Sequence, residues 1–282
     1  MTATQGFGDR VRDTLARFGP LCVGIDPHPH LLADWGLEAT SGGAREFGMR
    51  VVDAAAGRVG IVKPQVSFFE RFGAAGFIAL EQVLAAARAA DLIVIADAKR
   101  GDIGTTMDAY AEAWLTPGAP LEADAMTVNP FLGIGTLEGT FRLAEDSGKG
   151  VFVLAATSNP DAFTAQRAKL EGGQTVSGGI VAEVSARNAQ TTADGSWGSI
   201  GLVIGSTVDW SDAGMSAVDP PAPILGPGFG HQGAGPRDLP TRFGASAPLV
   251  IASESRSLLS AGPTGLAAAI ESRVHEYRSF DA

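Results

Sequence analysis

The chain has 282 residues, of which 45% are hydrophobic and 18% charged, a composition typical of a globular protein that can bury a sizeable core. Its net charge of −10 argues against broad nucleic-acid binding, which requires a basic surface, but allows local cations to hold a small anion. No apolar run is long enough for a transmembrane helix, and the polar N-terminus lacks the apolar core of a signal peptide. We therefore expect a cytoplasmic protein with no membrane or nucleic-acid partner.

Eight short apolar runs recur along the chain, and each is predicted to be a strand. They are rich in Val, Ile and Leu and show little polar alternation, as do strands of a parallel sheet that is covered on both faces. In chain order the predicted strands occupy residues 21–26, 60–65, 92–99, 125–130, 151–158, 201–207, 223–230 and 248–255.

Helix-like segments fill most of the gaps between these strands. They occupy residues 44–58, 75–90, 105–115, 135–148, 178–192 and 265–280, whereas the sixth gap, 209–222, is the least helix-like. Eight strands alternating with helices predict an α/β fold, a (β/α)8 TIM barrel, with an open doubly wound sheet as the alternative.

The connection after the fifth strand, at about 159–199, is long and rich in Gly, Ser, Gln and Thr. Long connections of this kind commonly carry functional loops. We interpret it as a loop and helix inserted at the active-site face of one barrel domain that spans residues 1–282.

Charged residues gather where the predicted strands end, which is where barrel enzymes carry their active sites. Strand alternation puts Asp97 and Lys99 on the inner face of the third strand, and the same rule puts Lys63 on the inner face of the second. Asp102 follows in the next loop. Four charges at one rim exceed what a structural ion pair requires, so Lys63, Asp97, Lys99 and Asp102 are predicted to form a catalytic cluster.

A second signal lies after strands seven and eight, where barrels often bind phosphate. The seventh strand runs into a glycine-rich turn at residues 227–233, whose backbone N–H groups can approach an anion closely. Arg256 follows the eighth strand, and its planar guanidinium suits phosphate oxygens. Together these features predict a phosphate site.

Metal and thiol chemistry are not expected. Cys22 is the one cysteine and sits within an apolar strand, so we interpret it as an inert buried thiol. The four histidines show no zinc spacing, and the His28-Pro29-His30 segment is interpreted as a polar loop rather than a ligand pair. The aromatic residues Phe68, Phe69 and Trp114 are predicted to belong to the core.

Seven segments of the sequence resemble those of one known protein family, and together they extend over nearly the whole chain. GIDPHP, KPQVSFFE, IADAKRGDIGTT, VNPFLG, TSNP, PGFGHQGAG and SESRSLLSAG occur in this order. The chain resembles orotidine 5′-phosphate decarboxylase, in the longer bacterial form found in mycobacteria and their relatives. The Asp-x-Lys-x-x-Asp pattern is shared with sugar-phosphate lyases on the same barrel, whereas its combination with KPQVSFFE and TSNP is specific. The resemblance implies a barrel of the ribulose-phosphate-binding type.

The resemblance also implies a reaction. Orotidine 5′-phosphate would lose CO2 and give UMP, the last step of de novo pyrimidine nucleotide synthesis, without a metal or cofactor. Lys99 would stabilise and then protonate a carbanion at C6, held by Asp97 and by Asp102 of the neighbouring protomer. Asp102 would enter that site with Ile103 and Thr106, which implies a homodimer with shared active sites.

Further roles are carried over residue by residue from the same motifs. Asp26 and Lys63 would contact the ribose, and Ser158 would hydrogen-bond to the pyrimidine. Gln232 and Arg256 would hold the phosphate. Gly228 and His231 are expected to contribute no more than a backbone contact.

Two other functions are weighed against this one. A magnesium-dependent sugar-phosphate decarboxylase or aldol lyase shares the motif, but Lys63 stands at a position where it would repel a cation. A barrel that binds nucleotides without catalysis is disfavoured because Lys63, Asp97, Lys99 and Asp102 are all present.

Overall fold

Eight parallel strands close into a barrel in the computed structural model, which describes residues 5–231 and 233–279. The strands are β1 (Leu21–Ile25), β2 (Ile61–Pro64), β3 (Ile93–Arg100), β4 (Ala125–Val128), β5 (Gly150–Ala156), β6 (Ile200–Ile204), β7 (Ile224–Pro227) and β8 (Val250–Glu254). They neighbour one another in chain order, and β8 pairs with β1 at Ala252 and Leu21. The predicted (β/α)8 barrel is confirmed, and the open sheet is wrong because the first and last strands are paired.

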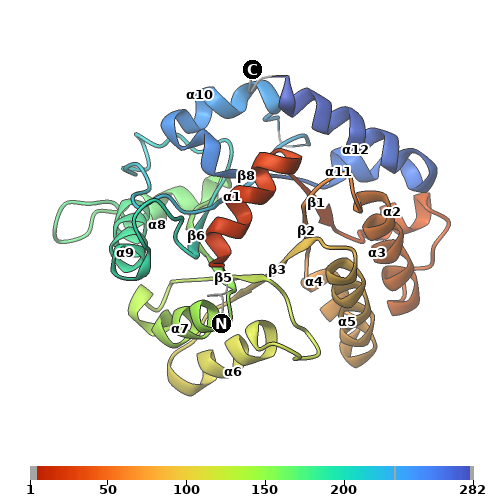
Figure 1. Cartoon of the computed structure of the whole chain (residues 1–282), viewed down its shortest axis with the longest axis horizontal. Helices are drawn as coiled ribbons and strands as arrows, with labels where there is room; N and C mark the ends of the chain where they lie inside the picture. Colours follow the sequence, from red (N-terminus) through yellow and green to blue (C-terminus); the bar gives the residue numbers. More distant parts are fainter. Residues whose placement is uncertain (1–4, 232, 280–282) are drawn as a thin grey trace.

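Helices surround the barrel as an outer layer (Figure 1). The α-helices are α1 (Phe7–Phe18), α2 (Pro29–Asp34), α3 (Ser41–Ala55), α4 (Ser67–Glu70), α5 (Gly73–Ala89), α6 (Gly104–Leu115), α7 (Glu138–Asp146), α8 (Phe163–Gln166), α9 (Val176–Thr191), α10 (Leu239–Phe243), α11 (Arg256–Leu259) and α12 (Gly262–Arg278). Short 3-10 helices are η1 (Ile134–Leu137), η2 (Pro160–Ala162), η3 (Pro236–Asp238) and η4 (Gly244–Leu249). No helix within 5–231 and 233–279 is long and apolar enough to cross a membrane.

The sixth connection has no helix of its own. Residues 205–223, all of which the structure describes, form turns between β6 and β7. The weak helical pattern of this gap in the sequence is therefore matched by the structure. The predicted last helix corresponds to α12, although residue 280 lies outside the described residues.

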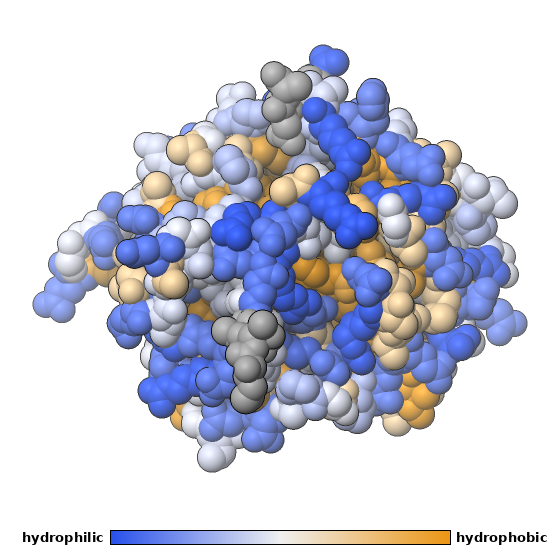
Figure 2. Space-filling view, in the orientation of Figure 1, coloured by the Kyte–Doolittle hydropathy of each residue, from blue (hydrophilic) through white to orange (hydrophobic). Residues whose placement is uncertain are grey.

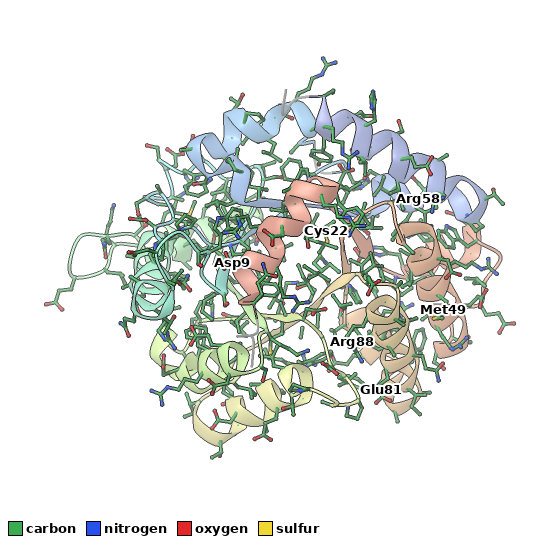
Figure 3. The ribbon with its side chains drawn as sticks, viewed as in Figure 1. Asp9, Cys22, Met49, Arg58, Glu81 and Arg88 are labelled. Atoms are coloured by element: carbon green, nitrogen blue, oxygen red, sulfur yellow. The ribbon has the colours of Figure 1, made fainter. Side chains whose placement is uncertain are left out.

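The barrel has two apolar cores because alternate strand residues face opposite sides of the sheet. The interior core includes Cys22, Ile61, Ile95, Phe152 and Ile251, while the larger core lies between the strands and the helices. Cys22 lies inside the barrel behind α1 (Figure 3). Burial raises the pKa of its thiol to about 12, so it carries no reactive thiolate at neutral pH.

Helix α1 crosses the end of the barrel at which the strands begin (Figure 1). Its Phe7 ring enters the interior core edge-on to Phe152, with 5.9 Å between ring centroids. Arg10 pairs with Asp124 at 2.6 Å, and the other oxygen of Asp124 accepts a hydrogen bond from the backbone N–H of Val94. Hydrophilic side chains predominate on this face (Figure 2). This end of the barrel is closed, which leaves the opposite end for a ligand.

A buried carboxylate joins the last strand to the last helix. Glu254 is 1% exposed and accepts hydrogen bonds from Arg273 and Tyr277 of α12 and from the Ser257 hydroxyl of α11. Burial and the charge of Glu254 raise the pKa of Tyr277, which keeps its hydroxyl a donor. Because Ser257 directly follows Arg256, this network fixes the start of α11 at the open end of the barrel.

A glycine in α1 tests how tightly this helix closes the barrel. A Cβ at Gly8 would lie 2.3 Å from the backbone carbonyl oxygen of Gly198, a contact that no rotamer change can relieve. We predict that Gly8→Ala lowers the free energy of unfolding by about 1–3 kcal/mol.

The matched control is Gly265→Ala in α12, where the added Cβ would meet only Ala261 at 3.5 Å. This change should raise the free energy of unfolding by about 0.5–1 kcal/mol, because alanine favours a helix interior. Denaturant unfolding of both variants measures whether each substitution raises or lowers the free energy of unfolding. A Gly8→Ala variant that is more stable than the wild type would show that α1 packs loosely.

Candidate active site

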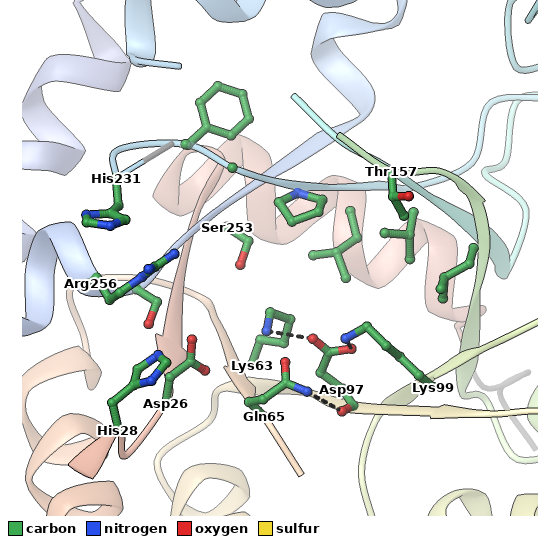
Figure 4. A pocket seen from close by; sticks show the side chains of 17 residues that line it. Asp26, His28, Lys63, Gln65, Asp97, Lys99, Thr157, His231, Ser253 and Arg256 are labelled. Carbon is green, nitrogen blue, oxygen red and sulfur yellow. Dashed lines mark hydrogen bonds and ion pairs between the residues drawn. The ribbon is translucent and has the colours of Figure 1, made fainter. Parts of the chain in front are cut away.

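A cavity of about 240 Å³ opens where the barrel strands end. Figure 4 shows that its lining side chains come from most of the strands and from the loops that follow them. Charged groups occupy two regions of the lining: Lys63, Asp97 and Lys99 at one end, and Arg256 at the other. The pocket therefore presents two separated ends to a ligand.

Asp97 organises the first end. Its Oδ2 lies 3.0 Å from the ammonium of Lys63, and its Oδ1 lies 2.6 Å from the ammonium of Lys99. The hydroxyl of Thr127 donates a third hydrogen bond to Oδ1 at 2.9 Å. Asp97 is 7% exposed, and these contacts from β2, β3 and β4 compensate for burying its charge.

The end of β3 departs from regular strand geometry at the lysine. Lys99 has a φ of +47°, and the pairing with β4 shifts register between Ala96 and Arg100. The backbone N–H of Lys99 donates to the Thr127 hydroxyl at 2.9 Å. Such left-handed backbone is uncommon for a residue with a side chain and is found at functional sites. Here it accompanies a Lys99 side chain that remains directed at Asp97.

Asp97 and Lys63 each favour the charged form of the other. Burial alone would raise the pKa of Asp97, but Lys63 and Lys99 outweigh burial and lower it. Burial alone would lower the pKa of Lys63, but Asp97 and Asp26 outweigh burial and raise it. Asp97 therefore stays ionised below the usual carboxyl range, and Lys63 stays protonated above the usual lysine range. Neither group titrates near neutral pH.

The second end of the cavity is built by three loops. Asp26 and His28 follow β1, His231 follows β7, and Arg256 begins α11 after β8. Asp26 Oδ1 is buried and has no hydrogen-bond partner within the described chain, so it is available to a polar group of a ligand. Leu154 and Val203 are among the apolar residues that line the wall.

Five of the residues predicted for the site line this one cavity, namely Asp26, Lys63, Asp97, Lys99 and Arg256. Gly228 and His231, from which only backbone contacts were expected, line it as well. Of the residues predicted to be core, Phe69 and Trp114 are buried, whereas Phe68 is half-buried against the His28 ring.

Four other predicted residues are not part of the cavity lining of the described chain. Asp102 accepts a hydrogen bond from the backbone N–H of Ile103 at 2.8 Å, and the Ile103 side chain is 59% exposed. Thr106 is exposed on the first turn of α6. Ser158 follows Thr157, a lining residue, but is not in the lining itself. Gln232 lies outside the described residues.

Several polar lining or supporting residues were missed by the sequence reasoning. Thr127 contacts both Asp97 and Lys99, and its inward position in β4 follows from alternation with Ala125 of the interior core. Gln65 donates to the Asp97 backbone carbonyl at 3.3 Å, and Thr157 also lines the pocket. Thr127 could have been predicted as a site residue, because it is a polar residue at an inward position of a strand.

Comparisons with known proteins agree with the geometry. A family model described as orotidine 5′-phosphate decarboxylase / HUMPS family matches residues 19–267. A Salinispora arenicola protein named orotidine 5′-phosphate decarboxylase is 47% identical over 259 residues, which cover 92% of this chain and 91% of the relative. A Corynebacterium efficiens protein of the same name is 45% identical over 285 residues, covering 98% of this chain and 99% of the relative.

A solved structure extends the likeness to three dimensions. The crystal structure of a candidate orotidine 5′-phosphate decarboxylase from Streptomyces avermitilis has a TM-score of 0.92 and 45% identity, covering 98% of this chain and 96% of that one. The match includes the whole barrel and therefore the strand ends that carry the cavity. This chain belongs to the orotidine 5′-phosphate decarboxylase family.

Proposed function

We propose that the protein decarboxylates orotidine 5′-phosphate to UMP and CO2 without a cofactor. The observation that carries the proposal is the Lys63–Asp97–Lys99 array, in which Lys63 and Asp97 are buried, at one end of a cavity whose other end holds Arg256. Membership of the family supports the reaction. An anionic nucleotide with a reacting base and a terminal phosphate matches the two separated ends.

The proposed orientation follows from charge. The pyrimidine C6 lies toward Lys99, and the phosphate lies toward Arg256, whose guanidinium suits phosphate oxygens. Asp26, with its unpaired buried oxygen, and Lys63 contact the ribose between them. In the same proposal, Ser158 contacts the pyrimidine and Gln232 is a second contact to the phosphate.

The chemical step breaks the bond between C6 and the carboxylate carbon and leaves its electron pair on C6 as CO2 departs. The ring π-system cannot delocalise that pair directly, so stabilisation must come from fixed charge nearby. The Lys99 ammonium, held at 2.6 Å by Asp97, supplies this charge. Lys99 then transfers a proton to C6 as general acid and regains one from solvent.

The phosphate contributes to rate as well as to affinity in this proposal. Binding energy from a group that does not react can hold the ring against Lys99 and keep a loop closed. The glycine-rich loop after β7 is the proposed closing element, since it carries His231 at the phosphate end.

We also propose a homodimer in which Asp102, Ile103 and Thr106 complete the partner's site. An exposed apolar surface near these residues supports this arrangement: Ile103 is 59% exposed and Phe131 is 89% exposed. Phe131 lies in the loop before η1, and η1 packs beside α6. Such a surface is typical of protein–protein contacts.

The segment at about 159–199 is proposed to be an insertion at the active-site face. Gln166 of α8 supports this role because it exchanges two 2.9 Å hydrogen bonds with Thr157, which lines the cavity. The segment therefore contacts the rim of the pocket through Gln166, and the Asn159 side chain also accepts a hydrogen bond from the Thr157 hydroxyl at 2.8 Å.

The role proposed for Lys99 can be tested by replacing its side chain. Lys99→Ala should lower kcat for orotidine 5′-phosphate by at least about 1000-fold, because charge stabilisation and the proton donor are both lost. The ultraviolet absorbance change on substrate loss measures this. Lys169→Ala, at an exposed lysine beyond β5, should leave kcat unchanged, and retained UMP binding by Lys99→Ala would show an intact fold. A wild-type protein that leaves the substrate untouched would refute the proposed function.

The proposed sharing of active sites between protomers can be tested by mixing two inactive variants. Asp102→Ala and Lys99→Ala, each inactive alone, should regain up to about a quarter of the wild-type activity per total site when equal amounts exchange protomers freely. Half of the dimers are then mixed, and each mixed dimer has one site with both residues intact. No recovery despite exchange shown by a tagged protomer would mean that Asp102 serves its own protomer.

A metal-dependent lyase on the same barrel is the alternative, and chelation separates the two. A cation at this site would have to lie beside the ammonium of Lys63, which is 3.0 Å from Asp97. Dialysis against EDTA should therefore leave kcat/KM for orotidine 5′-phosphate within experimental error. Activity that disappears on chelation and returns with Mg²⁺ would favour the lyase class.

A further inference from the structure

We propose that His28 is a ligand-binding residue, whose imidazole donates a hydrogen bond to the 5′-phosphate of the nucleotide. The inference rests on the proposed function, since it adds a residue to the phosphate end of the same site. His28 lines the cavity together with Asp26 and Arg256 (Figure 4). These three side chains lie at the end of the pocket away from Lys99.

The backbone around His28 is held by several contacts. Its N–H donates to the Asp26 carbonyl at 2.7 Å, which makes a tight turn directly after β1. Proline residues stand on both sides, and Pro27 is buried. The Pro27 carbonyl accepts a hydrogen bond from the Arg71 guanidinium at 3.1 Å. The turn is therefore fixed to the loop that follows β2, and His28 starts from a defined position.

The imidazole ring is held as well. It packs against the Phe68 ring with 4.2 Å between centroids and 59° between planes. Phe68 in turn lies 5.8 Å from the Arg71 guanidinium, measured from the ring centroid. A side chain that is already ordered before the ligand arrives loses little conformational entropy on binding, which favours affinity.

The charge of His28 suits a donor beside Arg256. Burial lowers the pKa of His28, and the neighbouring His30, Arg71 and Arg256 lower it further, while Asp26 opposes them. The imidazole is therefore neutral at pH 7 and offers one N–H donor. Arg256 and Lys63 already supply positive charge to the cavity, so a neutral donor adds a directed contact without further charge repulsion.

The neighbouring histidine provides a matched control. His30 lies two residues on in the same segment and its ring is 5.3 Å from that of His28. His30 is exposed and is not among the residues that line the cavity. A contact with the ligand is therefore expected of His28 and not of His30.

The experiment compares UMP with uridine, which differ only in the phosphate, as inhibitors of orotidine 5′-phosphate turnover. His28→Ala should raise the inhibition constant of UMP about 10- to 100-fold, as expected for one lost hydrogen bond to a charged group. The inhibition constant of uridine should change less than about threefold, and His30→Ala should change neither value. For the substrate, kcat/KM should fall by a similar factor, because the phosphate contact contributes to rate as well as to affinity.

Two results would overturn the inference. An equal loss of UMP and uridine affinity in His28→Ala would show that the residue supports the fold or the nucleoside. Unchanged UMP affinity would show no contact at all. His28→Asn, which keeps an N–H donor near the same position, should restore part of the UMP affinity, whereas a merely structural role would predict no selective rescue.

Calorimetric titration with UMP keeps this test separate from the proposed function. If the wild-type protein bound UMP but did not turn over orotidine 5′-phosphate, the proposed function would fail while the His28→Ala comparison stayed decisive. If turnover were normal and UMP affinity did not depend on His28, the present inference alone would fail.

Discussion

The buried carboxylate of Asp97 is the interaction on which the site depends. A lone carboxylate at the mouth of an apolar barrel would be protonated or displaced, but two ammonium groups and a hydroxyl from three adjacent strands compensate for its burial. The same contacts tie the ammonium groups of Lys63 and Lys99 to the two oxygens of one carboxylate. Removing either lysine would raise the pKa of Asp97, so the array acts as a unit.

The two ends of the barrel differ in role: one end is closed by packing, and the other end carries the cavity. At the end where strands begin, Phe7 and the Arg10–Asp124 pair close the interior. At the other end, the strand ends and loops direct polar groups into a cavity, and at least one of these groups lacks a partner within the described chain. The unpartnered oxygen of Asp26 is such a group, and a buried acceptor without a donor is unfavourable unless a ligand completes it.

Much of the fold could be predicted because each strand is an apolar run of consistent length, and alternation assigns its inward residues. Asp97 and Lys63 follow from that rule alone. The left-handed backbone of Lys99 and its contact with Thr127 could not be predicted, since they depend on a register shift between β3 and β4. The position of His28 could not be predicted for a similar reason: its ring packs against Phe68 of α4, which lies 40 residues further along the chain. Asp102 is not part of the cavity lining of the described chain, and its role stays a prediction from the family resemblance.

The Glu254 network has a consequence for the order in which the site can form. Its donors Arg273 and Tyr277 belong to α12, which follows all eight strands in the chain. Until that helix docks, Glu254 is a buried carboxylate with only Ser257 as partner, and the start of α11 beside Arg256 lacks its anchor. During synthesis, β2, β3 and β4, which carry Lys63, Asp97, Lys99 and Thr127, emerge well before the helix that anchors the Arg256 end. The Arg256 end of the cavity is therefore completed only after the final helix has left the ribosome.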